Sequence, residues 1–132
     1  MMLLFITIFV VIIFIAFIEN YIDKDKWYVY WAICAILILM AGFRPVGVDP
    51  DSANYELTFY NIDDPTVSFI FEYSFILICQ IGRLIINDVH IVFLTYAVIA
   101  ITIRFYAIKR LTPLIFLSLA IYLSNFYILH DF

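Results

Sequence analysis

The chain has 132 residues, of which 67% are hydrophobic, 20% aromatic and 14% charged, and its mean hydropathy is +1.09. Soluble domains carry charges on roughly a quarter of their residues, so this composition excludes an ordinary soluble fold and indicates an integral membrane protein. The formal net charge of −4 argues against a basic surface for nucleic acid or for anionic lipid headgroups.

Five apolar runs predict an all-α membrane protein with about five transmembrane helices, because a bilayer span needs about 20 residues. The connections are too short for independent domains, so the chain should form one polytopic unit in which adjacent helices pack as antiparallel hairpins. The expected spans cover residues 3–18, 28–43, 67–86, 91–108 and 113–129, and residues 44–66 form a motif loop and a short interfacial helix.

The first run is uncharged and follows the initiator Met1 without a basic leader or a small-residue cleavage site. We therefore expect a retained span and no cleavable signal peptide. A polar connection then leads to four aromatic residues, which we interpret as an interfacial belt. The belt consists of Trp27, Tyr28, Tyr30 and Trp31.

The orientation of the spans depends on how lysine and arginine are distributed over the loops. With the N-terminus outside, three basic residues would lie on the inner side and four on the outer side, and the reverse orientation exchanges these totals. The inner set would be Lys24, Lys26 and Arg83, and the outer set Arg44, Arg104, Lys109 and Arg110. The charges alone leave the orientation open.

The segment GFRPVGVDPDSANY, residues 42–55, interrupts the apolar chain with turn residues, one arginine and two carboxylates. Asp49 followed by Pro50 suits a helix N-cap with proline at the first helical position. The following residues carry an apolar stripe at helical spacing on a segment too polar to span, which predicts a helix lying along the membrane interface. The stripe consists of Tyr55, Phe59 and Ile62.

The polar residues of this segment allow two interpretations. Arg44 and Asp49 flank a proline and a glycine that favour a tight turn, while Asp51 and Tyr55 share one helix face. Arginine binds phosphate oxygens, and carboxylates act as bases or accept hydrogen bonds from sugars, so a pocket for an anionic lipid-linked sugar is one interpretation. In the other, Arg44 reaches toward the interface, Asp49 only caps a helix, and the turn residues only shape a loop.

Placed directly after the second apolar run, this string resembles the signature of the EpsG family of bacterial exopolysaccharide polymerases, which are related in role to Wzy-type polymerases. The rest of the chain is similar as well, so the resemblance covers nearly the whole sequence. The similar stretches are Phe71-Glu72-Tyr73 at the start of a run, residues 117–122 and residues 126–132.

The sequence departs from the family pattern in two respects. The family motif places an aspartate two residues after the glycine and four before the tyrosine, whereas here Asp49 has the first spacing and Asp51 the second. Family members also continue past the His130-Asp131 element into a Gln-Ile-Arg motif and more helices. The chain therefore resembles the N-terminal portion of a polymerase.

The resemblance implies glycosyl transfer outside the bacterial cytoplasmic membrane, joining oligosaccharide repeat units carried on undecaprenyl diphosphate. Arg44 would stabilise the diphosphate leaving group, Asp49 or Asp51 would act as the base, and Tyr55 would position a sugar. The motif loop and the N-terminus would then face outward. Other membrane proteins of polysaccharide assembly are implied as partners, and we expect no cofactor, no metal ion and no nucleic acid.

Outside the motif, Glu72 near the start of the third span is a candidate substrate-binding residue that should face the bundle or the pocket, or else an interfacial carboxylate reaching water. The resemblance gives His130 and Asp131 a possible substrate-binding role, and Arg83 is interpreted as an interface anchor. Two cysteines are interpreted as small buried side chains: Cys34 and Cys79.

Two other functions stay open. The chain could be a non-catalytic membrane subunit that binds lipid-linked sugar and is complemented by a second chain. It could also be a transporter or flippase fragment, although such a protein should place charges along the bilayer midplane, where this sequence has few.

Overall fold

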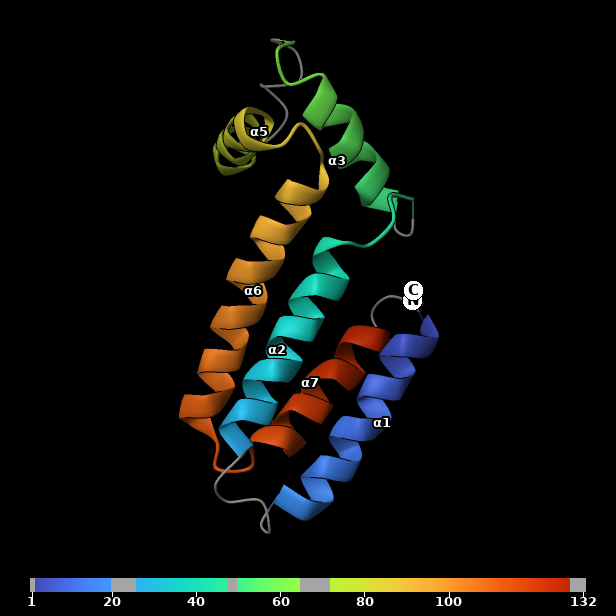
Figure 1. Cartoon of the computed structure of the whole chain (residues 1–132), viewed down its shortest axis with the longest axis vertical. Helices are drawn as coiled ribbons and strands as arrows, with labels where there is room; N and C mark the ends of the chain where they lie inside the picture. The colour runs from blue at the N-terminus through green and yellow to red at the C-terminus, as the bar shows by residue number, and fades with distance from the viewer. Residues whose placement is uncertain (1, 20–25, 48–49, 65–71, 129–132) are drawn as a thin grey trace. The chain divides into compact units, whose positions relative to one another are not determined.

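A computed structural model describes residues 2–19, 26–47, 50–64 and 72–128, and within these ranges it contains six helices and no strand (Figure 1). The all-helical class expected from the sequence is therefore confirmed for the described residues. The helices are α1 (Met2–Ile18), α2 (Lys26–Gly42), α3 (Pro50–Tyr60), α5 (Tyr73–Ile85), α6 (His90–Leu111) and α7 (Ile115–Ile128). Only α6, among the described helices, is long and apolar enough to cross a bilayer; α2, α5 and the described parts of α1 and α7 are shorter apolar helices.

The contacts divide the chain into two compact units. Unit 1 comprises residues 1–37 and 100–132, and unit 2 comprises residues 38–99. Helices α2 and α6 each contribute residues to both units, whereas α1 and α7 belong to unit 1 and α3 and α5 to unit 2.

The core of unit 1 is built around Tyr30 of α2, which is completely buried. Its ring packs against the rings of Phe105 on α6 and Phe116 on α7, with centroid distances of 4.7 Å and 6.0 Å. Its hydroxyl donates a 2.7 Å hydrogen bond to the Phe105 carbonyl oxygen. The assignment of Tyr30 to an interfacial belt is therefore wrong. A buried phenol is stable here because it has a hydrogen-bond acceptor.

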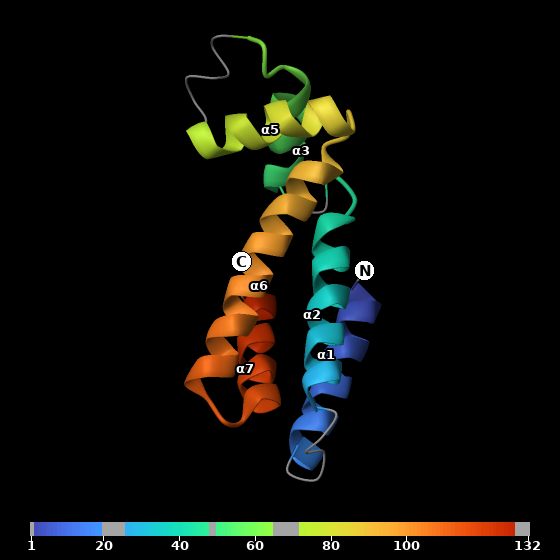
Figure 2. The same ribbon diagram turned by 60° about the vertical axis from the view of Figure 1, so that its left-hand side comes forward.

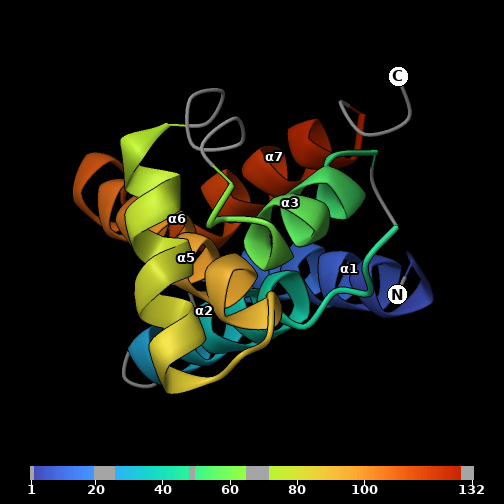
Figure 3. The ribbon, with the colours of Figure 1, turned by 90° about the horizontal axis from the view of Figure 1, so that it is seen from above.

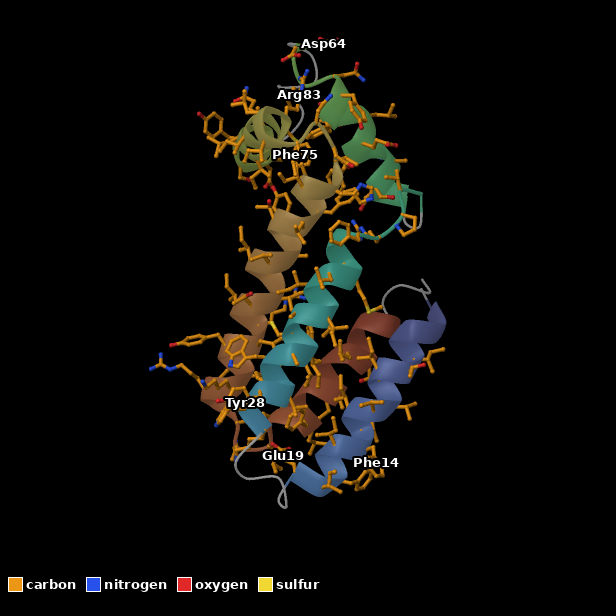
Figure 4. All side chains as sticks on the ribbon, in the orientation of Figure 1. Phe14, Glu19, Tyr28, Asp64, Phe75 and Arg83 are labelled. Atoms are coloured by element: carbon orange, nitrogen blue, oxygen red, sulfur yellow. The ribbon has the colours of Figure 1, made fainter. Side chains whose placement is uncertain are left out.

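Helices α1 and α7 lie side by side in unit 1 (Figures 1 and 3). At the end of α1, the buried carboxylate of Glu19 accepts hydrogen bonds from the backbone N–H groups of Ile115 at 2.8 Å and Phe116 at 3.3 Å (Figure 4). These N–H groups belong to the first turn of α7 and have no partner within their own helix. Glu19 thus caps α7 from a distant part of the chain.

Unit 2 is held together by a cluster of buried apolar residues from α3, α5 and the beginning of α6. Helix α3 begins at Pro50, as the sequence predicts. Its apolar stripe faces this cluster, because Phe59 and Ile62 are buried in it and Tyr55 packs against it. The cluster consists of Phe59, Ile62, Phe75, Cys79, Val89, Val92 and Phe93, of which Phe75 is labelled in Figure 4.

Residues 67–71 of the span expected over residues 67–86 lie outside the described residues, and helix α5 covers Tyr73–Ile85. It has 13 residues, and both flanking residues, Glu72 (φ −61°, ψ 142°) and Ile86 (φ −143°, ψ 116°), have extended backbones. Figure 2 shows α5 running across the beginning of α6 and not alongside it, so the antiparallel hairpin expected for this pair is not formed. A close contact fixes the crossing, because a Cβ atom on Gly82 would lie 2.6 Å from Ile91 Cγ2.

Candidate functional site

The candidate site is built on the segment that joins α2 to α3, which lies entirely in unit 2. Helix α2 ends at Gly42, where it approaches α6 closely: a Cβ atom here would lie 2.6 Å from Leu94 Cδ1 and 3.0 Å from Leu94 Cα. Contacts this short allow no side chain at position 42 without displacement of α6. This glycine therefore determines where the chain carrying Arg44 leaves the helix.

Arg44 is half-buried, and its guanidinium lies over the ring of Phe93 on α6, with 4.9 Å between Cζ and the ring centroid. This is the geometry of a cation–π contact, which holds the planar guanidinium against an apolar surface. Because Phe93 is itself part of the buried cluster, the position of the positive charge is fixed by the core of unit 2.

The turn after Arg44 depends on Gly47, whose φ of +90° is strained for residues with a Cβ atom. Its N–H donates a 2.8 Å hydrogen bond to Oγ of Ser52, which is fully buried in the first turns of α3. This bond ties the turn to the helix. The expected approach of Arg44 to Asp49 lies outside the described residues.

One face of α3 borders an open hollow with a volume of about 340 Å³. It is lined by Asp51, Asn54, Tyr55, Leu57 and Thr58, four of which recur at helical spacing on one side of the helix. The Tyr55 ring packs against the ring of Phe75 on α5, with 5.2 Å between the ring centroids. An exposed carboxylate, an amide and a supported aromatic ring are side chains that can hydrogen-bond to and stack on a sugar.

The structure brings only some of the sequence-predicted site residues together. Asp51 and Tyr55 come together at this hollow, and Arg44 lies in the same unit without being among the residues that line it. Glu72 occupies the N-cap position of α5, where its side chain is exposed and makes no capping hydrogen bond, so it faces neither the buried cluster nor the hollow. Three predicted site residues, Asp49, His130 and Asp131, lie outside the described residues.

A histidine–aspartate pair at the start of α6 was not predicted. Asp88 Oδ1 lies 2.7 Å from Nδ1 of His90 and accepts a 2.9 Å hydrogen bond from the His90 backbone N–H. These hydrogen bonds, the backbone one first, lower the pKa of Asp88 below its usual value. The His90 ring lies 6.0 Å from Phe93, so His90 and Arg44 both contact that ring. The Asp-x-His spacing directly before an apolar run is the sequence pattern from which this pair could have been predicted.

A second unpredicted pair connects the turn after α3 to α5. Arg83, which the sequence suggested as an interface anchor, donates a 2.8 Å hydrogen bond to the Asp63 carboxylate (Figure 4 labels Arg83). The Asp63 side chain is largely exposed, so this ion pair contributes at most about 1 kcal/mol. Within the described ranges, no group of three or more histidine, cysteine or acidic side chains is placed to hold a metal ion.

Comparison with known proteins gives one match. The family model described as the EpsG family matches residues 27–132, a stretch that includes the whole motif segment and helices α3 to α7. No curated protein and no solved structure matches the chain.

Proposed function

Because this chain belongs to the EpsG family of Wzy-like polysaccharide polymerases, we propose that it takes part in joining lipid-linked oligosaccharide repeat units into exopolysaccharide or capsule at the bacterial cytoplasmic membrane. The observation that carries this proposal is the family match over residues 27–132, because it includes the motif segment that holds Arg44 and Asp51.

A membrane location is supported by where α6 exposes its apolar side chains. The helix has 22 residues, and only 22% of its most apolar stretch is buried, whereas the core helix of a soluble protein would be mostly buried. At 1.5 Å per residue, α6 is about 33 Å long, enough for the hydrocarbon core of about 30 Å. Its exposed stripe consists of Tyr96, Ile99, Ile103 and Tyr106, as expected of a lipid-facing surface.

The proposed reaction is a glycosyl transfer between two undecaprenyl-diphosphate-linked chains. The acceptor hydroxyl oxygen forms a bond to the anomeric carbon of the donor sugar, the bond from that carbon to the diphosphate oxygen breaks, and the hydroxyl proton passes to a base. Arg44 is assigned to the leaving diphosphate, because a guanidinium forms paired hydrogen bonds to phosphate oxygens. Asp51 or Asp49 is assigned to the base, and Tyr55 to positioning a sugar.

The geometry supports this division of roles. A base must reach the acceptor hydroxyl, and Asp51 is exposed beside Tyr55 in an open hollow that a sugar can enter. The positive charge of Arg44 is fixed by Phe93, which suits a group that must stay in place while negative charge develops on the leaving group.

The test is complementation of a polymerase-deficient strain with the gene that encodes this chain. We expect Arg44→Ala to abolish polymer, and at least one of Asp49→Asn and Asp51→Asn to do the same. Glu56→Gln is the matched control, because Glu56 is another carboxylate of α3 but does not line the hollow, and it should retain full polymer.

Membrane abundance of each variant must equal that of the wild-type chain, so that loss of polymer reports on chemistry. If all three motif variants restore polymer as well as Glu56→Gln does, the assignment of the motif to the reaction is wrong. If polymer is lost while the purified variant still binds lipid-linked oligosaccharide as tightly as the wild-type chain does, the substitution impairs the glycosyl transfer step and leaves substrate binding intact.

A further inference from the structure

Helices α2 and α6 run in opposite directions, as the contacts in unit 1 show, and the contact in unit 2 agrees with this. In unit 1, Lys109 Nζ lies 4.4 Å from the centroid of the Trp27 ring, and Phe105 packs against Tyr30. Residue numbers therefore rise along α2 while they fall along α6. In unit 2 the end of α2 likewise meets the beginning of α6, where the rings of Phe43 and His90 are stacked with 6.5 Å between their centroids.

Opposite directions restrict how the intervening chain can cross a membrane. If α2 and α6 both span, the chain leaves α2 and enters α6 on the same side of the bilayer. Residues 43–89 must then cross the bilayer an even number of times. The five-span arrangement expected from the sequence contains a single crossing by α5 between them, so it would make α2 and α6 parallel.

The dimensions of α5 agree with this restriction. Thirteen residues at 1.5 Å each give a helix about 20 Å long, which is too short for a hydrocarbon core of about 30 Å. Its flanking residues are extended, and the helix runs across the beginning of α6 (Figure 2). A helix that crosses a membrane-spanning helix in this way lies closer to the membrane plane than to its normal.

The two sides of α5 have different surroundings. One side packs on the buried cluster of unit 2 through Phe75, Cys79 and Gly82. The other side exposes a row of large apolar side chains, of which Tyr73 is 79% and Leu84 is 87% exposed. Leu77 and Ile81 complete this row, which we call the outer face of α5.

We propose that α5 does not cross the bilayer but lies in its headgroup region, with the outer face of α5 against lipid, and that residues 43–89 stay on the non-cytoplasmic side. The proposal rests on the proposed function in one respect, the spanning of the membrane by α6, and it also requires that α2 crosses beside it; the 17 residues of α2 reach the lower limit for a span, whereas the 13 of α5 do not. Lipid is the occupant because the four-residue connection to α6 holds α5 at the end of a spanning helix, next to the bilayer surface.

The same topology resolves the orientation that the loop charges left open. With residues 43–89 on one side, that side carries two of the seven basic residues, and the other five come before residue 27 or after residue 103 in the sequence. The positive-inside rule then places the five in the cytoplasm and the motif outside. The two are Arg44 and Arg83, and the five are Lys24, Lys26, Arg104, Lys109 and Arg110.

Sidedness is tested with single cysteines in a background in which Cys34 and Cys79, both buried, are replaced by alanine. The reporters are Asn61→Cys before α5, Asn87→Cys after α5 and Leu111→Cys at the end of α6, all at exposed positions. Spheroplasts are treated with a membrane-impermeant maleimide before and after permeabilisation. We expect Asn61→Cys and Asn87→Cys to react fully in intact spheroplasts, and Leu111→Cys only after permeabilisation.

Each alternative labelling result contradicts a different part of the proposed topology. Reaction of Asn61→Cys and Asn87→Cys from opposite sides would show that α5 crosses, which overturns the proposal. Reaction of both only after permeabilisation, with Leu111→Cys open to the outside, would overturn the orientation. If all three react from one side, α6 does not span, and the membrane arrangement in the proposed function is itself wrong.

The position of α5 in the bilayer is tested by nitroxide labels in the same cysteine-free background, with the full chain reconstituted in liposomes. Labels at Leu77 and Leu84 should report a depth between that of a label at Asn87, in water, and one at Ile99, near the middle of α6. A depth equal to that of Ile99 would place α5 in the hydrocarbon core. A depth equal to that of Asn87 would place the outer face of α5 in water. Either result overturns the proposal.

Discussion

Replacing Glu19 should destabilise unit 1, because this buried carboxylate is the acceptor for two N–H groups at the start of α7. A hydrogen bond to a charged group contributes about 1.5–3 kcal/mol, and the 3.3 Å bond to Phe116 belongs at or below the lower end. Glu19→Ala removes both acceptors and should cost about 3 kcal/mol. Glu19→Gln keeps one acceptor oxygen but loses the charge at the helix N-terminus, and should cost about 1–2 kcal/mol.

Thermal unfolding in detergent measures this effect, with a thiol-reactive fluorogenic dye detecting exposure of the buried Cys34 and Cys79. For a chain of this size, 1 kcal/mol corresponds to about 4 °C, so we expect shifts of about 12 °C for Glu19→Ala and about 4–8 °C for Glu19→Gln. The matched control is Glu72→Ala, because Glu72 is a glutamate at the N-cap position of α5 that makes no side-chain capping bond. Glu19 variants that unfold at the same temperature as the Glu72 variant would refute the capping role.

Three further substitutions test other contacts by the same unfolding assay. Gly42→Ala places a methyl group 2.6 Å from Leu94 Cδ1, so we expect a loss of about 1–3 kcal/mol; an unchanged midpoint would contradict the close helix approach. Tyr30→Phe removes one buried hydrogen bond and should cost about 0.5–1.5 kcal/mol, whereas no change would show that the bond is not formed. The lowered pKa of Asp88 stabilises the fold above the unfolded-state pKa, near pH 4, and this contribution disappears as pH falls through the folded-state value. Asp88→Asn should therefore unfold at a lower temperature than wild type at pH 7, and this difference should shrink as pH falls from about 4 through the lower folded-state pKa; a difference that does not change with pH would contradict the linkage.

The sequence determined where helices form, because helix formation depends on neighbouring residues. Apolar runs and polar connections located the helices, and Pro50 marked the beginning of α3. The same local reasoning indicated that Cys34 and Cys79 are buried and that Asp51 and Tyr55 share a helix face. The pairing of Asp51 and Tyr55 in the candidate site is thus readable from residue type and spacing alone.

Only the tertiary structure decided which distant residues meet. Glu19 and Ile115 are 96 positions apart, and no periodicity in the sequence connects them. The beginning of α5 is another case, because hydropathy scores apolar character but does not detect the extended backbone at Glu72. The opposite directions of α2 and α6 follow from contacts between residues far apart in sequence. Such contacts depend on the packing of whole helices, which local spacing does not encode.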